Sequence, residues 1–204
     1  MATGIPVTVG ELVDTPTINT WARGYFRKTT AKTVNTTTTA TDLLNGEFTL
    51  PAGALGTNKV LRLTASGDWK QNSGASRDVP RFVFKLGATT LLDTGNTGSN
   101  AVTAAATRYG WRIVCEAQNL GAANSQWSTL TGMLVTSAAT PASADFTTGE
   151  GRLWVNDVFG CFYSGGNSTA VDTSASLAVV LNVINANNSA NYETKLYGAL
   201  VEII

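Results

Sequence analysis

Hydrophobic and polar residues alternate along several segments of the chain, with the two-residue period of a half-buried β-strand. The period is clear over residues 59–69, 81–86 and 108–117. Each of these segments is therefore expected to form a strand with one face toward a core. The side chains expected to point inward are Leu61, Leu63, Ala65, Phe82, Phe84, Leu86, Trp111, Ile113 and Cys115, and those expected to point outward include Arg62, Val83, Arg112 and Glu116.

Six further segments are expected to be strands from their composition. The Thr-rich run 33–44 contains many β-branched residues, which favour strands. Apolar residues are frequent in segments 125–137 and 192–204, and in the two short segments 153–155 and 158–163. Segment 177–184 is apolar on both parities, which predicts a strand that is covered on both faces. Turn-forming residues separate the segments at intervals of about 10–15 residues, and no amphipathic helix is evident.

This pattern predicts an all-β protein in which two antiparallel sheets pack as a β-sandwich of jelly-roll type. Residues 32–204 are expected to form this sandwich as one domain, since all-β domains of about 200 residues commonly form a single unit. Residues 1–31 lack a clean period and mix Pro6, Gly10 and Pro16 with Thr-rich stretches. They are predicted to be an extended N-terminal arm.

The end of this arm carries aromatic and basic residues, which are the types that contribute most to binding at protein interfaces. They are Trp21, Arg23, Tyr25, Phe26 and Arg27. One interpretation makes them an anchor to a partner. The alternative is that the aromatic side chains cover one end of the domain's own core.

The chain is poor in charge. It has 204 residues, with 14 Lys and Arg, 14 Asp and Glu, no histidine and a charged fraction of 14%, whereas ordinary domains are about 25% charged. A zero net charge without a basic block argues against nucleic-acid binding as the main function. The lack of histidine removes the commonest general base and metal ligand, together with every Ser-His-Asp or Cys-His arrangement.

Targeting and redox features are few. No segment approaches the about 20 apolar residues that span a bilayer, and residues 1–14 have neither the basic nor the apolar region of a signal peptide. Synthesis in a cytoplasm and no membrane partner are therefore expected. Cys115 and Cys161 lie in apolar, strand-like contexts, which favours buried thiols. A disulfide between neighbouring strands is the alternative.

A search for reactive groups assigns no catalytic residue, no metal ligand and no cofactor site. The sequence contains no CxxC, HExxH or EF-hand pattern, and its scattered aspartates are typical of Asx turns. Trp111 and Trp154 lie on apolar strand parities and are expected in the core. Trp69 is followed by the polar segment 70–72 and is expected at a surface or a subunit edge.

Three stretches together resemble virion proteins of tailed bacteriophages. They are LPAGALGTNKVLRLTASGDWKQNSG (50–74), RFVFKLGATTLLDTG (81–95) and WRIVCEAQNLGAANSQWSTLTG (111–132). In that family a loop of the type F-x-I/L-P-A-G-x-L-G-x-N precedes a strand that ends in glycine, and an LGxTTLLDT hairpin follows. The resemblance covers roughly residues 33–135 and includes no catalytic motif. It implies a trimeric jelly roll on a capsid lattice or on a tail fibre.

These observations lead to the hypothesis of a non-enzymatic capsid cement or decoration protein, which is made in the host bacterial cytoplasm and located on the virion surface. Its expected partners are the major capsid protein and copies of itself in a homotrimer. A surface with few charges suits such contacts, because charged residues are depleted at interface cores. The arm residues and Trp69 are the expected partner-binding residues.

Two alternatives have other functions. One is a receptor- or glycan-binding head domain of a tail fibre, with Trp69 or another exposed aromatic residue at the binding site. The other is a polysaccharide depolymerase.

Overall fold

The computed structural model describes residues 25–72, 79–95, 105–137, 151–155, 158–186 and 188–204. These residues form an all-β structure, and none of them lies in a helix. The strands, in chain order, are β1 (Tyr25–Lys28), β2 (Lys32–Asn35), β3 (Thr41–Asp42), β4 (Thr49–Leu50), β5 (Val60–Gln71), β6 (Arg81–Leu86), β7 (Thr89–Asp93), β8 (Ala105–Asn119), β9 (Gln126–Ser137), β10 (Gly151–Val155), β11 (Val158–Thr169), β12 (Leu177–Ile184) and β13 (Tyr192–Ile203).

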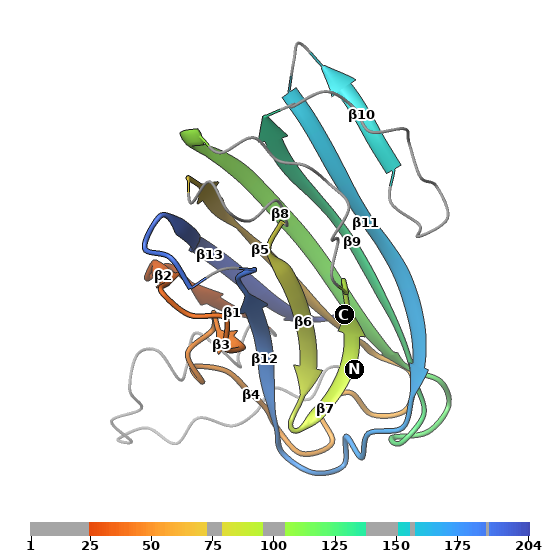
Figure 1. Ribbon diagram of the computed structural model, residues 1–204. Helices are drawn as coiled ribbons and strands as arrows, with labels where there is room; N and C mark the ends of the chain where they lie inside the picture. Colours follow the sequence, from red (N-terminus) through yellow and green to blue (C-terminus); the bar gives the residue numbers. More distant parts are fainter. Residues whose placement is uncertain (1–24, 73–78, 96–104, 138–150, 156–157, 187) are drawn as a thin grey trace.

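The strands form two antiparallel sheets that pack face to face (Figure 1). The large sheet is eight-stranded with the order β1-β13-β5-β8-β9-β11-β10, and β2 also pairs with β13. The small sheet is five-stranded with the order β3-β12-β6-β7, and β4 also pairs with β12. The protein is therefore a β-sandwich, which confirms the fold class predicted from the alternating pattern.

The core lies between the two sheets, and every side chain that the alternation assigns to it is buried. Phe82 of β6 packs on Trp111 of β8, with ring centroids 4.9 Å apart. This contact joins the small sheet to the large one. Val83, which the pattern places outward, is also buried, because β6 is an interior strand on which Val83 lies between Asn182 of β12 and Asp93 of β7.

Two strand predictions need correction in their details. The run 33–44 forms β2 and β3 rather than one strand, because Thr36 has a φ of 52° and the chain leaves the extended conformation there. β12 is not covered equally on both faces. Val179, Leu181 and Val183 are buried toward the large sheet, whereas the alternating residues between them are exposed or half-buried.

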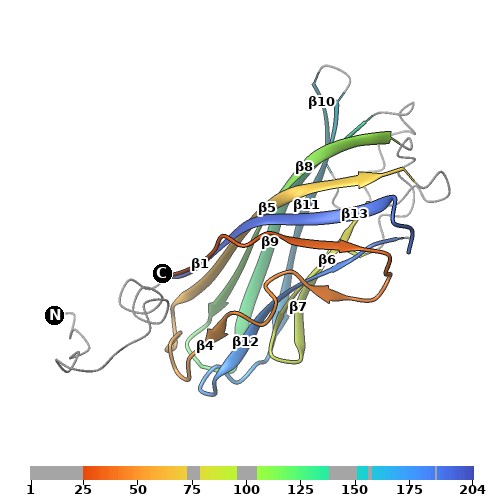
Figure 2. The same cartoon turned by 90° about the vertical axis from the view of Figure 1, so that its left-hand side faces the viewer.

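β1 belongs to the large sheet and not to a separate arm. It pairs with residues 199–202 of β13 along one edge of the sheet (Figure 2). Phe26 packs on Phe48, with ring centroids 5.2 Å apart, and the buried Lys28 forms an ion pair with Glu47. The described part of the domain therefore begins at Tyr25, earlier than the predicted boundary after residue 31. Residues 1–24 lie outside the described residues.

Candidate functional site

The outer face of the large sheet, which is turned away from the small sheet, carries opposite charges paired across neighbouring strands. On β5 and β8 the even-numbered residues point to this face, because their odd-numbered neighbours are buried. Nε of Arg62 lies 2.7 Å from Oε1 of Glu116. Arg108 forms ion pairs with both Asp68 and Glu193. Cross-strand pairs of this kind stabilise a sheet.

A groove lies on this face where irregularities of two neighbouring strands meet. β1 and β2 both pair with β13, but the edge strand is interrupted at residues 29–31 between them. β13 has a β-bulge between Leu196 and Gly198, so Tyr197 is the extra residue. Bulges re-aim side chains and are frequent beside functional sites. We call the resulting space, which has a volume of about 760 Å³, the Tyr197 groove.

The Tyr197 groove has both polar and apolar groups in its lining and one aromatic wall. The lining includes Arg27, Thr29, Thr64, Ser66, Tyr197 and Glu202. Tyr197 is 49% exposed. Neither Arg27 nor Glu202 forms an ion pair with another residue in the part of the chain that the structure describes. Their charged ends are therefore available to a ligand.

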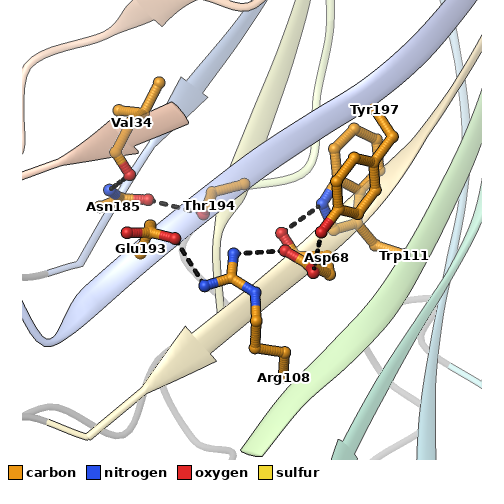
Figure 3. Close-up of polar contacts among 8 residues, drawn as sticks. All are labelled: Val34, Asp68, Arg108, Trp111, Asn185, Glu193, Thr194 and Tyr197. Carbon is orange, nitrogen blue, oxygen red and sulfur yellow. Dashed lines mark hydrogen bonds and ion pairs between the residues drawn. The ribbon is translucent and has the colours of Figure 1, made fainter. Parts of the chain in front are cut away.

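Tyr197 contacts Asp68, as Figure 3 shows, and also Lys195. Its hydroxyl donates a hydrogen bond of 2.7 Å to Oδ2 of Asp68, and Nζ of Lys195 lies 5.0 Å from its ring centroid, within cation–π distance. Asp68 also accepts a hydrogen bond from Arg108, whose Nη1 lies 2.5 Å from Oε1 of Glu193. The ring of Tyr197 is thereby preorganised, which lowers the entropic cost of binding a ligand against it.

Hydrogen bonds on the inner side of the sheet hold the same strands. Nε1 of Trp111 donates a bond of 3.1 Å to the main-chain oxygen of Asp68. Asn185, which follows β12, donates a bond of 3.0 Å to the main-chain oxygen of Val34 in β2 and accepts one of 2.8 Å from the hydroxyl of Thr194 in β13. These contacts connect β8 to β5, and the residue after β12 to β2 and β13 (Figure 3).

Asp68 is stabilised as an anion. Burial raises the pKa of Asp68, but the hydrogen bonds from Arg108 and then from Tyr197 outweigh this effect, and the net pKa lies below its usual value. The hydrogen bond to Asp68 also raises the pKa of Tyr197. A general acid needs a raised pKa. Asp68 is therefore suited to positioning Tyr197 rather than to donating a proton.

Replacing Tyr197 with phenylalanine is expected to raise the pKa of Asp68, because the carboxylate loses one hydrogen bond and keeps Arg108. In the wild type the folded pKa is below the ordinary value of 3.8. This lowered pKa stabilises the folded state relative to the unfolded state. The stabilisation is complete above pH 3.8 and is lost as the pH falls through the folded pKa. In the variant this contribution is smaller. An NMR titration of the Asp68 carboxyl carbon in both proteins measures the change, and equal pKa values would contradict the hydrogen bond.

Two further kinds of reactive group, metal-binding clusters and thiols, bear on the chemistry of the described part of the chain. Among them, no group of three or more His, Cys, Asp or Glu side chains could hold a metal ion. Cys115 is a buried free thiol, which confirms the prediction, and burial raises the pKa of its thiol so that it stays protonated. The side chain of Cys161 lies outside the described set. The groups that the outer face presents are fixed charges, hydroxyls and aromatic rings.

An exposed tryptophan is the second feature of the outer face. Trp127 of β9 is 45% exposed, and its neighbours Gln126 and Ser128 point inward. A Cβ atom on Gly166 of β11 would stand 2.7 Å from Cζ2 of Trp127, so the indole lies directly over that glycine. Leu120 is 51% exposed and lies at the turn between β8 and β9. We call Trp127, Leu120 and Gly166 the Trp127 patch.

The predicted surface position of Trp69 is wrong. Its side chain is 0% exposed and lies between Tyr109 and Tyr192, whose ring centroids are 6.4 Å and 6.0 Å away. β5 continues to Gln71, so Trp69 keeps the inward parity of the preceding residues of the strand. The tryptophan that is shown to be exposed is Trp127.

Of the other predicted partner-binding residues, the structure describes the side chains of Phe26 and Arg27, and these two do not lie together. Phe26 points inward and packs on Phe48, as expected if the aromatic residues cover the domain's own core. Arg27 is exposed and lines the Tyr197 groove. The main chain of Tyr25 pairs with β13, but its side chain lies outside the described set. Trp21 and Arg23 also lie outside the described residues.

Comparisons with known proteins give two results. No protein-family model matches the chain, and no curated protein sequence matches it. In the described residues, no helix has the length and apolar character needed to cross a membrane.

Proposed function

We propose that this protein is a non-enzymatic structural protein of a tailed-bacteriophage virion, a jelly-roll-like decoration protein that binds the head lattice. Its partners in this proposal are the major capsid protein and copies of itself in a homotrimer. It is made in the host bacterial cytoplasm and acts on the capsid surface. The resemblance of residues 33–135 to virion proteins and the β-sandwich fold support the proposal.

The Trp127 patch is the observation that carries the proposal. An indole lying over a glycine presents a broad apolar surface, and tryptophan is enriched among the residues that contribute most to protein–protein binding. Leu120 adds a second large apolar side chain on the same hairpin. Exposed apolar groups that gather in one place mark interaction sites. The patch is therefore the expected contact with the lattice.

The charge pairs of the outer face suit a protein that is packed among neighbours. Arg62 is already paired with Glu116, and Arg108 with Asp68. When a partner covers such a pair, each charge is buried together with its opposite charge. Burying an unpaired charge would cost much more free energy. Several weak contacts joined in one symmetric body then give strong overall binding through avidity.

Purified protein added to capsids that lack it is expected to bind saturably and to raise the temperature of capsid disruption. Trp127→Ala is expected to weaken binding about tenfold or more, because it removes the central side chain of the patch. Co-sedimentation of capsid and protein over a concentration series measures the affinity.

Tyr197→Ala is the matched control, since it removes an equally exposed aromatic side chain from the same sheet. It should bind capsids as the wild type does. Absence of saturable wild-type binding would overturn the decoration role. Equal binding by Trp127→Ala and the wild type would overturn the assignment of the patch.

A further inference from the structure

We infer that the Tyr197 groove is a binding site for a neutral saccharide. The groove lies over β1, β13 and β5, whereas the Trp127 patch lies on β9 and β11, and β8 separates the two. The inference therefore does not depend on the capsid contact. The volume of the groove, about 760 Å³, is within the range of roughly 300–1,000 Å³ that is usual for small-molecule sites.

Tyr197 supplies the apolar wall of the site. One face of a pyranose ring consists of C–H groups, and such a face packs on an aromatic ring, which combines an apolar body with a polar end. The hydroxyl of Tyr197 is fixed by Asp68, and Lys195 lies over the ring. The ring is therefore already fixed before a ligand binds. Binding then costs little side-chain entropy, which favours association even in an open groove.

Side-chain hydroxyls supply the polar contacts. Thr64 and Ser66 are two residues apart on β5 and point to the same face, about 6.7 Å apart along the strand. Thr29, which lies between β1 and β2 at the edge of the sheet, also lines the groove. Each hydroxyl both donates and accepts a hydrogen bond. This dual character matches the hydroxyls of a sugar, which also do both.

Arg27 and Glu202 determine the expected charge of the ligand. Arg27 can only donate hydrogen bonds and the ionised Glu202 can only accept them. A vicinal diol has the complementary groups, because one hydroxyl can accept from a guanidinium while the other donates to a carboxylate. Lys28, the third charged residue of the lining, is already paired with Glu47, so Arg27 and Glu202 leave no net charge at the groove. A neutral ligand is therefore favoured over an anion or a cation.

An extended peptide fits the groove less well. Peptides that add to a sheet use main-chain hydrogen bonds at a free strand edge. Beneath the groove, β13 pairs with β5 on one side, with Gly198 opposite Ser66. On the other side of β13, residues 197–198 lie between the segments that pair with β2 and β1, and two residues are too few for an added strand. The ligand must therefore be held by side chains and by the aromatic ring, which is the way that a saccharide is bound.

The test is an array of neutral oligosaccharides built from glucose, galactose, mannose and N-acetylhexosamines, with sialylated and uronic-acid glycans as the acidic arm. The labelled full-length protein is applied, and calorimetry then gives the affinity for any glycan that binds. The wild type is expected to bind at least one neutral glycan. Tyr197→Ala should weaken this binding about tenfold or more, and Arg27→Ala should weaken it as well.

Trp127→Ala is the matched control and should bind the glycan as the wild type does, although it is the variant expected to lose capsid binding. Failure of the wild type to bind any neutral glycan would overturn the inference, as would binding to acidic glycans alone. Glycan binding that is lost in Trp127→Ala and kept in Tyr197→Ala would also overturn it. Because Arg27 is exposed, Arg27→Ala gives a result even if the Tyr197 variant fails to fold.

Discussion

Replacing Gly67 with alanine is expected to lower the free energy of unfolding by about 4 kcal/mol or more, which is at the upper end for single substitutions. A Cβ atom at this position would stand 1.8 Å from the carbonyl oxygen of Lys195 and 2.7 Å from Cζ2 of Trp111. The main chain of β13 cannot move away without breaking its pairing with β5. Trp111 cannot move freely either, because it packs on Phe82. Equilibrium unfolding in urea measures the loss.

Gly110→Ala is the matched control on the neighbouring strand β8. A Cβ atom on Gly110 would have its nearest neighbour at 4.0 Å, the carbonyl oxygen of Gly67. Where the backbone accepts it, a change from glycine to alanine alters stability by about 1 kcal/mol or less and is commonly stabilising. Equal stability of Gly67→Ala and Gly110→Ala would contradict the close packing of β13 against Gly67 at the bulge.

Trp69→Ala is expected to lower the free energy of unfolding by about 3–5 kcal/mol, the usual cost of removing a large buried aromatic side chain. Trp69 is fully buried, and its indole packs between Tyr109 and Tyr192. Removal leaves a cavity between three strands of the large sheet, since these residues come from β5, β8 and β13. Chemical denaturation followed by far-ultraviolet circular dichroism gives the value without depending on tryptophan fluorescence.

Trp127→Ala provides the comparison for the same chemical change at an exposed position. Trp127 keeps 45% of its surface exposed, so its replacement is expected to cost about 1 kcal/mol or less. Similar losses in the two variants would contradict the burial of Trp69. A larger loss for Trp127→Ala would reverse the assignment of the core and surface tryptophans.

The strands and their inner faces could be predicted because the pleat of a strand fixes a side-chain period of two. The same rule, applied over the whole of β5, also gives the position of Trp69. The polar segment 70–72 suggests a surface position for Trp69, but β5 continues to Gln71 and keeps its alternation. Gln71, one of those residues, is itself 2% exposed, so polarity alone did not mark the strand end.

The Tyr197 groove could be predicted only in part. One signal is present in the sequence, because the charged residues of β13 change from odd positions (Glu193, Lys195) to an even position (Glu202), which indicates a bulge between them. The buried positions change correspondingly from even to odd numbers. The remaining contacts depend on strand order. Arg108 is 40 residues from Asp68 and 85 residues from Glu193 in the chain. Periodicity does not determine which strands become neighbours, so it could not bring these three side chains together.

The most direct measurement of the proposed function is a reconstruction of a complete virion that contains this chain. We expect density for the β-sandwich on the head surface, at positions of local threefold symmetry, with the Trp127 patch facing the major capsid protein. Density for the chain on the tail alone, or a head surface without it, would contradict the proposal that it is a capsid decoration protein.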